Sequence, residues 1–288
     1  MHQVPGYYRK RVGDITVTAL QDGYIPRAFD DLIAGVPAAD QKAELARQHL
    51  PTDAMQIGLN GYLVQSGDHL TLIDTGAATG FGPTCGHLGA NLAAAGVTPD
   101  RIDTVLITHL HADHANGLLA EDGSAAFPNA EIKVTEAEHA FWHDDAMAGK
   151  FAGFADFFTA ARTAVAAYGD RVTLTSGSGD VAPGISAVPL PGHTPGHTGY
   201  LATSGDASLL IWGDIAHSQP LQFAHPDWSV VFDIDPDTAR ATRRRILDRV
   251  QTDAQAIAGM HLFYPGFGRV ERKGDGYALI PALWDYSV

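Results

Sequence analysis

The chain has 288 residues, of which 45% are hydrophobic and 18% are charged, proportions that are normal for a soluble globular protein. Its formal net charge of −14 argues against a nucleic-acid partner, because phosphate binding requires a basic surface. The single cysteine, Cys85, excludes an intramolecular disulfide and a thiolate metal cage. No apolar run is long enough for a membrane span and the N-terminus has no apolar signal region, so we expect a cytoplasmic protein without a membrane partner, or a periplasmic one if a signal peptide was removed.

Predicted strands and helices follow one another along the whole chain. In the first half, strands are predicted at residues 14–20, 60–65, 70–73, 102–107 and 130–134, with a turn at 21–24. Helices are predicted at 40–49, at 83–95, from Thr135, where a capping residue precedes acids, and at 151–167. In the second half, strands are predicted at 172–175, 185–189, 199–202, 208–212, 256–261 and 277–280, with a helix at 236–250 that begins at a proline.

This order predicts an α/β fold in which two packed sheets are flanked by helices and the two halves repeat one plan. We expect a single domain over residues 1–288. Its N-terminal segment, residues 1–55, holds an irregular stretch ahead of the main sheet and could form a lid or a dimer arm. A cluster of five arginines between residues 240 and 249 is interpreted as a solvated helix face.

The densest group of candidate metal ligands lies directly after the predicted 102–107 strand, where the sequence reads H-x-H-x-D-H. Residues two apart on an extended chain point the same way, so His109 and His111 can both reach one ion. Asp113 and His114 follow past a bend and can address a second ion. Because a catalytic ion usually takes about three protein ligands, four candidates at this spacing suggest a site with two ions.

Three later stretches have the same form, an apolar run that ends in a possible ligand. They supply His193 and His197 in the loop at 191–198, Asp214 after the 208–212 strand, and His261 at the end of the 256–261 strand. A carboxylate at Asp214 could offer one oxygen to each of two cations. An isolated aspartate at a strand end is more often a turn former, but together these residues make a strong case for a metal centre.

The ordered series of ligands resembles the pattern of the metallo-β-lactamase superfamily. The resemblance implies an αββα sandwich, with a first metal held by His109, His111 and His193 and a second held by Asp113, His114 and His261. Asp214 would bridge the two metals. His197 would then support its loop, and Asp74 would be the structural aspartate that this family carries at a strand end.

Further stretches resemble methyl parathion hydrolase and its lactonase relatives within that superfamily. They are residues 61–64, 74–77, 81–84, 127–130 and the 191–198 loop. The resemblance implies a homodimeric hydrolase of small-molecule lactones or esters, with phosphotriester (organophosphate) hydrolysis as a side activity. It would use two divalent ions, Zn²⁺ first and Co²⁺, Mn²⁺ or Fe²⁺ as alternatives, and a hydroxide that bridges them.

The catalytic residues expected on this basis are Asp113, Asp214 and His217. Related acyl-homoserine lactonases have a tyrosine three residues after the bridging aspartate, where this chain has His217, so that residue is either a substrate-orienting group or a surface histidine. Aromatic residues that could shape an apolar pocket are Phe141, Trp142, Phe157, Phe158, Phe223 and Phe267, and of these Trp142, Phe223 and Phe267 are the ones expected to line it.

Asp214 argues against a true β-lactamase, which lacks an aspartate at the bridging position. Two other members of the superfamily stay open as alternatives: an iron-dependent persulfide dioxygenase and a glyoxalase II-like thioester hydrolase.

Overall fold

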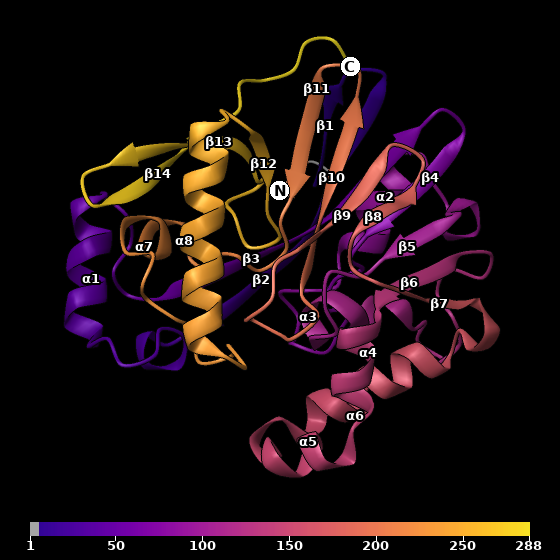
Figure 1. Cartoon of the computed structure of the whole chain (residues 1–288), viewed down its shortest axis with the longest axis horizontal. Helices are drawn as coiled ribbons and strands as arrows, with labels where there is room; N and C mark the ends of the chain where they lie inside the picture. The colour runs from indigo at the N-terminus through magenta and orange to yellow at the C-terminus, as the bar shows by residue number, and fades with distance from the viewer. Residues whose placement is uncertain (1–5) are drawn as a thin grey trace.

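Two seven-stranded sheets packed face to face form the centre of the molecule, and helices lie on the outside of both (Figure 1). The computed structural model describes residues 6–288. The predicted αββα sandwich is confirmed. None of the helices in residues 6–288 combines the length and the apolar character needed to cross a bilayer.

The first sheet contains the N-terminal strands in sequence order, and the second is built from the C-terminal half. The strands of the first sheet are β1 (Tyr7–Val12), β2 (Ile15–Arg27), β3 (Met55–Ser66), β4 (His69–Ile73), β5 (Thr104–Leu106), β6 (Glu131–Thr135) and β7 (Val172–Thr175). Those of the second are β8 (Gly179–Ala182), β9 (Ile185–Pro189), β10 (Thr198–Ser204), β11 (Ala207–Ile211), β12 (Ala256–Ala258), β13 (Phe267–Lys273) and β14 (Gly276–Pro281).

Parallel pairing is confined to one side of the first sheet and to the middle of the second. Strands β4 to β7 pair in parallel, and so do β11 and β12, whereas the other pairs are antiparallel. The carboxyl ends of β4, β5 and β11 therefore lie on one side of the sandwich, and the loops that leave them can meet there.

Eight α-helices lie within residues 6–288. They are α1 (Ala38–Arg47), α2 (Leu88–Ala94), α3 (Ala112–Ala115), α4 (Glu136–His143), α5 (Asp145–Lys150), α6 (Ala155–Ala166), α7 (Gln219–Ala224) and α8 (Pro236–Thr252). Short 3₁₀ turns lie at Phe29–Asp31, Pro99–Arg101, Asn116–Leu118, Ala152–Phe154 and Gly169–Arg171. Helices α2, α4 and α6 cover the outer face of the first sheet, and α8 covers the second.

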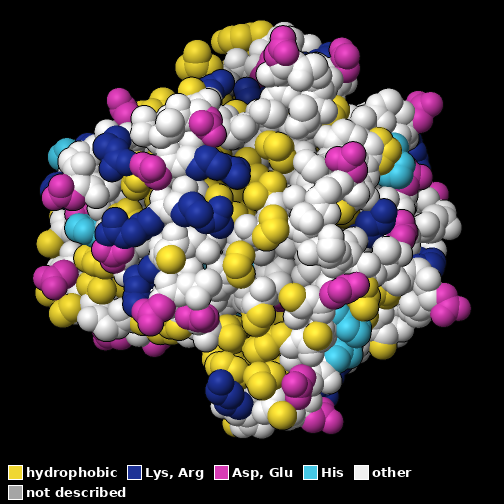
Figure 2. Space-filling model, in the orientation of Figure 1, with side chains coloured by type: hydrophobic (Ala, Val, Ile, Leu, Met, Phe, Trp, Pro, Cys, Tyr) yellow, Lys and Arg dark blue, Asp and Glu magenta, His cyan; other side chains and the backbone are white. Residues whose placement is uncertain are grey.

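The predicted solvated face of α8 is correct except at one residue. Lys and Arg side chains gather over this helix on the surface (Figure 2). Arg243, however, is only 1% exposed, and its guanidinium donates hydrogen bonds to the carbonyl oxygens of Ile215 and Pro226. This arginine therefore belongs to the interior, where it ties α8 to the loop that follows β11.

The predicted turn at residues 21–24 is wrong, because β2 continues through it to Arg27. The register of β2 against β3 shifts between Gln21 and Gly23, which marks a β-bulge. The buried carboxylate of Asp22 then accepts hydrogen bonds from the backbone N–H groups of Ala77 (2.8 Å) and Leu88 (2.9 Å). These hydrogen bonds from the bulge fix the irregular stretch before α2. The helix predicted from residue 83 therefore begins only at Leu88.

Three strands and three helices were absent from the predicted elements. Strands β1, β8 and β13 lie toward sheet edges or in hairpins, and the helices α3, α5 and α7 are only four to six residues long. Helices this short carry too few residues to display a period.

The N-terminal segment divides into two parts, apart from residues 1–5, which lie outside the described residues. Strands β1 and β2 belong to the first sheet and are part of the sandwich. Residues 28–54, including α1, pack against α7 in an apolar cluster with Phe29, Leu45 and Leu221. This places the predicted lid or arm beside the loop that follows β11.

Replacing Gly23 by alanine is expected to lower the free energy of unfolding by about 2 kcal/mol or more. Gly23 has a φ of +136°, and a Cβ atom there would lie 2.0 Å from the carbonyl oxygen of Thr84. Chemical denaturation measures the change. Gly149→Ala, in α5 with open space around the position, is the control and is expected to leave stability the same or slightly higher. Equal stability of the two variants would contradict the role of the bulge.

Candidate metal centre

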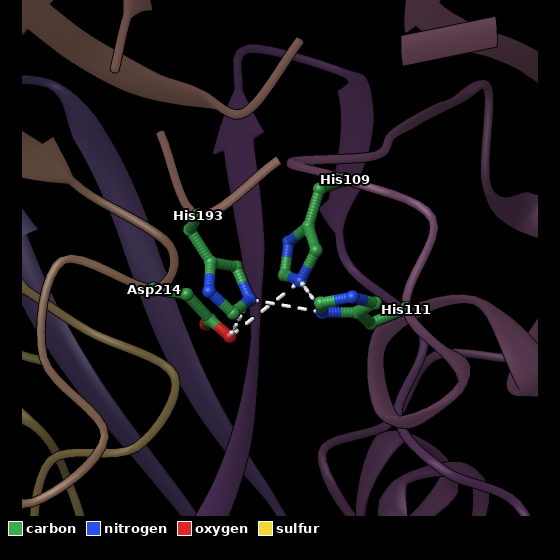
Figure 3. Close-up of side chains that lie close together, drawn as sticks. All are labelled: His109, His111, His193 and Asp214. Carbon is green, nitrogen blue, oxygen red and sulfur yellow. Dashed lines mark hydrogen bonds and ion pairs between the residues drawn. The ribbon is translucent and has the colours of Figure 1, made fainter. Parts of the chain in front are cut away.

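The candidate ligands come from loops of both sheets and converge at one end of the sandwich. His109 and His111 follow β5, with His111 just before α3, whereas His193 follows β9 and Asp214 follows β11. Their side chains point toward one another from opposite sides (Figure 3). All four are buried, with at most 3% of each exposed.

The first predicted ligand set is assembled as three facing imidazole nitrogens. His111 Nδ1 lies 3.0 Å from His109 Nε2 and 2.9 Å from His193 Nε2. Burial, together with neighbouring histidines, holds the pKa of His109 and of His111 well below the usual range, so both rings are neutral. Neutral imidazole is the form that binds a metal.

The second predicted set is assembled next to the first. Asp113, His114 and His261 present ligand atoms that all lie within 4.8 Å of one another. Asp113 Oδ2 lies 3.6 Å from His114 Nε2 and 3.5 Å from His261 Nε2. Asp113 and His114 lie on α3, and the His114 ring lies beside the ring of His109 in the first set, at a centroid distance of 4.1 Å.

Asp214 lies between the two sets. Its Oδ2 atom is close to the Nε2 atoms of five histidines, at 3.0 Å for His217, 3.1 Å for His261, 3.2 Å for His114, 3.3 Å for His193 and 3.5 Å for His109. Burial alone would raise the pKa of this carboxyl, but the surrounding histidines dominate and hold it well below its usual range. A carboxylate so placed can serve both sets.

The donor set fits divalent cations. Four buried polar atoms at the centre have no hydrogen-bond partner within the described part of the chain: His111 Nε2, His114 Nε2, Asp214 Oδ1 and His217 Nδ1. Buried polar atoms are rarely left unsatisfied in native proteins. With only nitrogen and oxygen donors, two groups of three or four ligands suit Zn²⁺ or a similar transition-metal ion.

The two supporting residues expected from the sequence take structural positions. Asp74, at the end of β4, accepts hydrogen bonds from the Thr108 N–H (2.8 Å) and from His114 Nδ1 (2.7 Å). His197 accepts a hydrogen bond from the Asp214 N–H at Nε2 (2.9 Å), and its Nδ1 donates to the Leu190 carbonyl (2.8 Å). Both residues therefore orient ligands from outside the cluster, as expected.

A second supporting carboxylate, Glu138, was expected only as an acid in the first turn of α4. It is fully buried and accepts hydrogen bonds from the N–H of Leu110 (2.9 Å) and the hydroxyl of Thr194 (2.6 Å). One carboxylate thus joins the loop that carries His109 and His111 to the loop that carries His193.

A third supporting carboxylate, Asp233, was not expected from the sequence. It accepts a hydrogen bond from His193 Nδ1 at 2.9 Å, with Arg243 close behind at 3.7 Å. Carboxylates that orient metal-binding histidines in this way are common in metalloproteins. No local pattern marks this residue, because its partner His193 lies 40 residues earlier in the chain.

His217 is part of the cluster and is not a surface histidine. It is 5% exposed, its ring stacks on that of His261 at a centroid distance of 4.8 Å, and its backbone N–H donates to Gln222 Oε1 at 2.7 Å. Burial lowers the pKa of His217 to about 4. The side chain faces the opening of the site.

A cleft and a larger cavity open next to the ligands. The cleft is lined by the ligands His111, Asp113, Asp214 and His261, by His217, and by Ile25, Arg27, Ile57, Phe81, Phe157 and Phe232. The adjoining cavity has a volume of about 290 Å³ and lies between residues 32–57 and 217–220. Both share Ile57, His217 and His261, so one molecule can extend from the ligands into the cavity.

The three aromatic residues expected to shape the pocket do not line it. Trp142 is fully buried, donates a hydrogen bond to Glu138 (2.6 Å) and packs edge-on against the His111 ring. Phe223 packs on Trp212 under the second sheet, and Phe267 packs on Tyr62 between the sheets. Their burial follows from core packing, which is the usual place of large aromatics. Phe157, another of the six candidates, does line the cleft, together with Phe81 and Phe232.

Comparison with protein families finds a match over most of this architecture. The profile of the metallo-beta-lactamase superfamily matches residues 58–261, a range that contains all seven candidate ligands. The expected resemblance to that superfamily is thereby confirmed.

Individual relatives agree with the family match. A crystal structure of AbOPH, a hydrolase in the beta lactamase superfamily, is 34% identical, with a TM-score of 0.93 and coverage of 99% of this chain and all of that one. AidC, a dizinc quorum-quenching lactonase in complex with a product, N-hexanoyl-L-homoserine, is 26% identical, with a TM-score of 0.90 and coverage of 97% and 98%. An N-acyl homoserine lactonase of Bacillus thuringiensis is 25% identical over 169 residues, and the match spans only 58% of the length of each protein.

Replacing Asp233 by asparagine is expected to weaken zinc binding about 10-fold, because the His193 ring loses its anionic hydrogen-bond partner. Competition with a chromophoric chelator measures the affinity. Asp227→Asn, at an exposed ion pair with Arg244, is the matched control and should leave zinc affinity unchanged. The same zinc affinity in both variants would show that Asp233 does not orient the ligand.

Proposed function

The chain belongs to the metallo-β-lactamase superfamily, and from this premise we propose that it is a hydrolase of lactones or carboxylic esters that works with two divalent cations. The observation that carries the proposal is the position of Asp214. Its Oδ2 atom lies within 3.5 Å of a histidine nitrogen from each of the two ligand sets, as a bridge between two ions requires. A site for one ion would not need a shared carboxylate.

We assign His109, His111 and His193 to one ion and Asp113, His114 and His261 to the other, with Asp214 between them. Zn²⁺ is the first expectation, because all ligands are nitrogen or oxygen and the lone cysteine is buried elsewhere. When bound, such a pair of cations supplies a nucleophile from water at neutral pH and polarises the oxygen under attack. Asp113 and Asp214 are then the catalytic carboxylates of the proposed reaction.

The chain itself binds and orients the substrate. The cleft walls of Ile25, Ile57 and Phe157 exclude water from one side of the reacting group. His217 Nδ1 is buried and unpaired within residues 6–288, so it can hydrogen-bond a substrate held at the ligands. Residues 28–54 form a wall of the adjoining cavity. A lid over the site is one of the two roles expected for this segment, and we include it in the proposal.

Lactones come first among the substrates because two of the relatives above are lactonases of acylated homoserine. Phosphotriesters are a second class, supported by the resemblance of several loops to methyl parathion hydrolase. A homodimer is part of the proposal, and light scattering on the purified protein tests it. The large apolar side chains of Leu283, Trp284 and Tyr286, 66–91% exposed, are candidates for its contact surface.

Metal analysis followed by a hydrolysis panel tests the reaction. Protein purified without added metal is expected to hold about two equivalents of zinc or a similar ion per chain, and chelation is expected to abolish lactone and ester hydrolysis until Zn²⁺, Co²⁺ or Mn²⁺ is restored. About one equivalent of iron with persulfide-dependent oxygen uptake would contradict the proposal. So would a preference for S-lactoylglutathione, the substrate type of glyoxalase II.

His217→Ala is expected to lower kcat/KM for a lactone about 10-fold or more, because the substrate loses an orienting contact beside the ligands. Metal content and melting temperature are measured in parallel, since His217 also contacts Asp214. His143→Ala, at an exposed position on α4, is the control. An unchanged kcat/KM in a fully loaded His217→Ala protein would remove this residue from the site.

A further inference from the structure

Arg27 is a cationic side chain in the cleft that the proposed reaction does not use. It is the last residue of β2 and lines the cleft together with the ligands His111 and Asp214. Its Nε atom is buried and has no hydrogen-bond partner within residues 6–288. Arginine Nε is a strong donor, and leaving such a donor buried and unpaired is costly.

Arg27 forms no ion pair with a carboxylate within residues 6–288. Of the other thirteen arginines, six form such pairs, namely Arg47, Arg162, Arg240, Arg243, Arg244 and Arg272. The guanidinium of Arg27 instead lies over the ring of Phe232, at 5.2 Å from the ring centroid. A planar guanidinium stacked on an aromatic ring has its face covered and its N–H edge left for an acceptor in the plane.

The β-sheet determines which way this side chain points. Ile25 and Arg27 are two residues apart on β2 and therefore share a face, and Ile25 lies opposite Ile57 of β3. Ile25 and Ile57 both line the cleft, so Arg27 extends the same wall by one strand position. The acidic side chains in this cleft are Asp113 and Asp214, and both belong to the ligand sets.

We propose that Arg27 binds an acceptor oxygen of the substrate that is distal to the bond being cleaved. This inference rests on the proposed function and narrows its substrates to lactones or esters that carry a second oxygen function, an amide carbonyl or a carboxylate. The apolar remainder of the molecule enters the adjoining cavity, whose walls include Leu32, Leu45, Leu50, Met55 and Phe263.

The geometry favours a substrate with three parts. The reacting carbonyl lies at the ligands, the acceptor oxygen lies at the Arg27 edge, and an alkyl or aryl group fills a volume of about 290 Å³. A purely apolar ester would leave the Arg27 donor desolvated and unpaired, and sites built to hydrogen-bond a substrate group discriminate against analogues that lack it.

Two lactones that differ only at the acceptor test the proposal. In N-hexanoyl-L-homoserine lactone the side chain on the ring begins with an amide, and in α-heptyl-γ-butyrolactone two methylenes replace that amide. Arg27→Met is expected to raise KM for the amide lactone about 10-fold with little change in kcat, as expected for loss of a charged hydrogen bond made equally in the ground and transition states. KM for the heptyl lactone is expected to change less than about 2-fold.

A pair of esters identifies the acceptor. Para-nitrophenyl hexanoate and mono-para-nitrophenyl adipate differ by a terminal carboxylate. Loss of selectivity in Arg27→Met within the lactone pair assigns an amide carbonyl, and loss within the ester pair assigns a carboxylate. Arg27→Lys is expected to retain part of the selectivity of the wild-type protein. Arg245→Met, at an exposed position on α8, is the control and is expected to leave that selectivity unchanged. An equal effect of Arg27→Met on both members of each pair would overturn the proposal.

A binding measurement separates this proposal from the proposed function. Calorimetric titration of N-hexanoyl-L-homoserine and of its ring-opened heptyl counterpart needs no turnover. Arg27→Met is expected to bind the first about 10-fold more weakly and the second with unchanged affinity. Suppose that Arg27→Met loses affinity only for N-hexanoyl-L-homoserine, and that the wild-type protein hydrolyses neither lactone. The proposed hydrolase function would then be contradicted, and the proposed role of Arg27 would remain supported. An equal loss of affinity for both acids, with the ester preference of the wild-type protein unchanged in Arg27→Met, would reject the role of Arg27 alone.

Discussion

The position of the Asp214 carboxylate is the constraint on which the rest of the site depends. One oxygen of this side chain lies within reach of histidines from the loops after β5, β9, β11 and β12, and therefore from both sheets. The backbone before it turns at Gly213 with a φ of +60°, where a Cβ atom would lie 2.3 Å from His197 Nε2. The loop can take this path only with glycine, because the imidazole that holds the Asp214 N–H occupies the space.

Around this residue, buried carboxylates hold the ligand loops after β5 and β9, whereas His261 is oriented by the carbonyl oxygen of Gly58. Asp74 orients His114, Asp233 orients His193, and Glu138 joins the two loops from opposite sheets. Burial raises the pKa of Asp74 and of Glu138, and hydrogen bonds to both carboxyls act in the opposite direction. Burying acids is expensive, and it is tolerated where several donors converge on each one. Hydrogen bonds to these carboxylates thus orient the imidazole ligands.

The parts of this architecture that local patterns determine could be predicted from the sequence. The spacing of His109, His111, Asp113 and His114 and the ends of three later strands identified the ligand candidates, because strand ends and two-residue periods are visible in a single chain. The bulge at Gly23 and the roles of Glu138 and Asp233 could not be predicted in this way, since their partners lie 28 or more residues away. For the same reason Arg243 looked like its solvated neighbours, and Phe223 and Phe267 could not be distinguished from the aromatics of the cleft.

The division of the ligands between two sheets has a consequence for how the protein is made. The histidines of the loop after β5 leave the ribosome well before His193, Asp214 and His261, which are 84 to 152 residues further along the chain than His109. Contacts this distant in sequence form late in folding. A nascent chain that has only its first sheet therefore offers an ion one loop of ligands, and a complete centre arises only when the second sheet has docked. Binding of metal by the full set of ligands therefore requires the complete fold. Neither half of the chain could form the centre on its own.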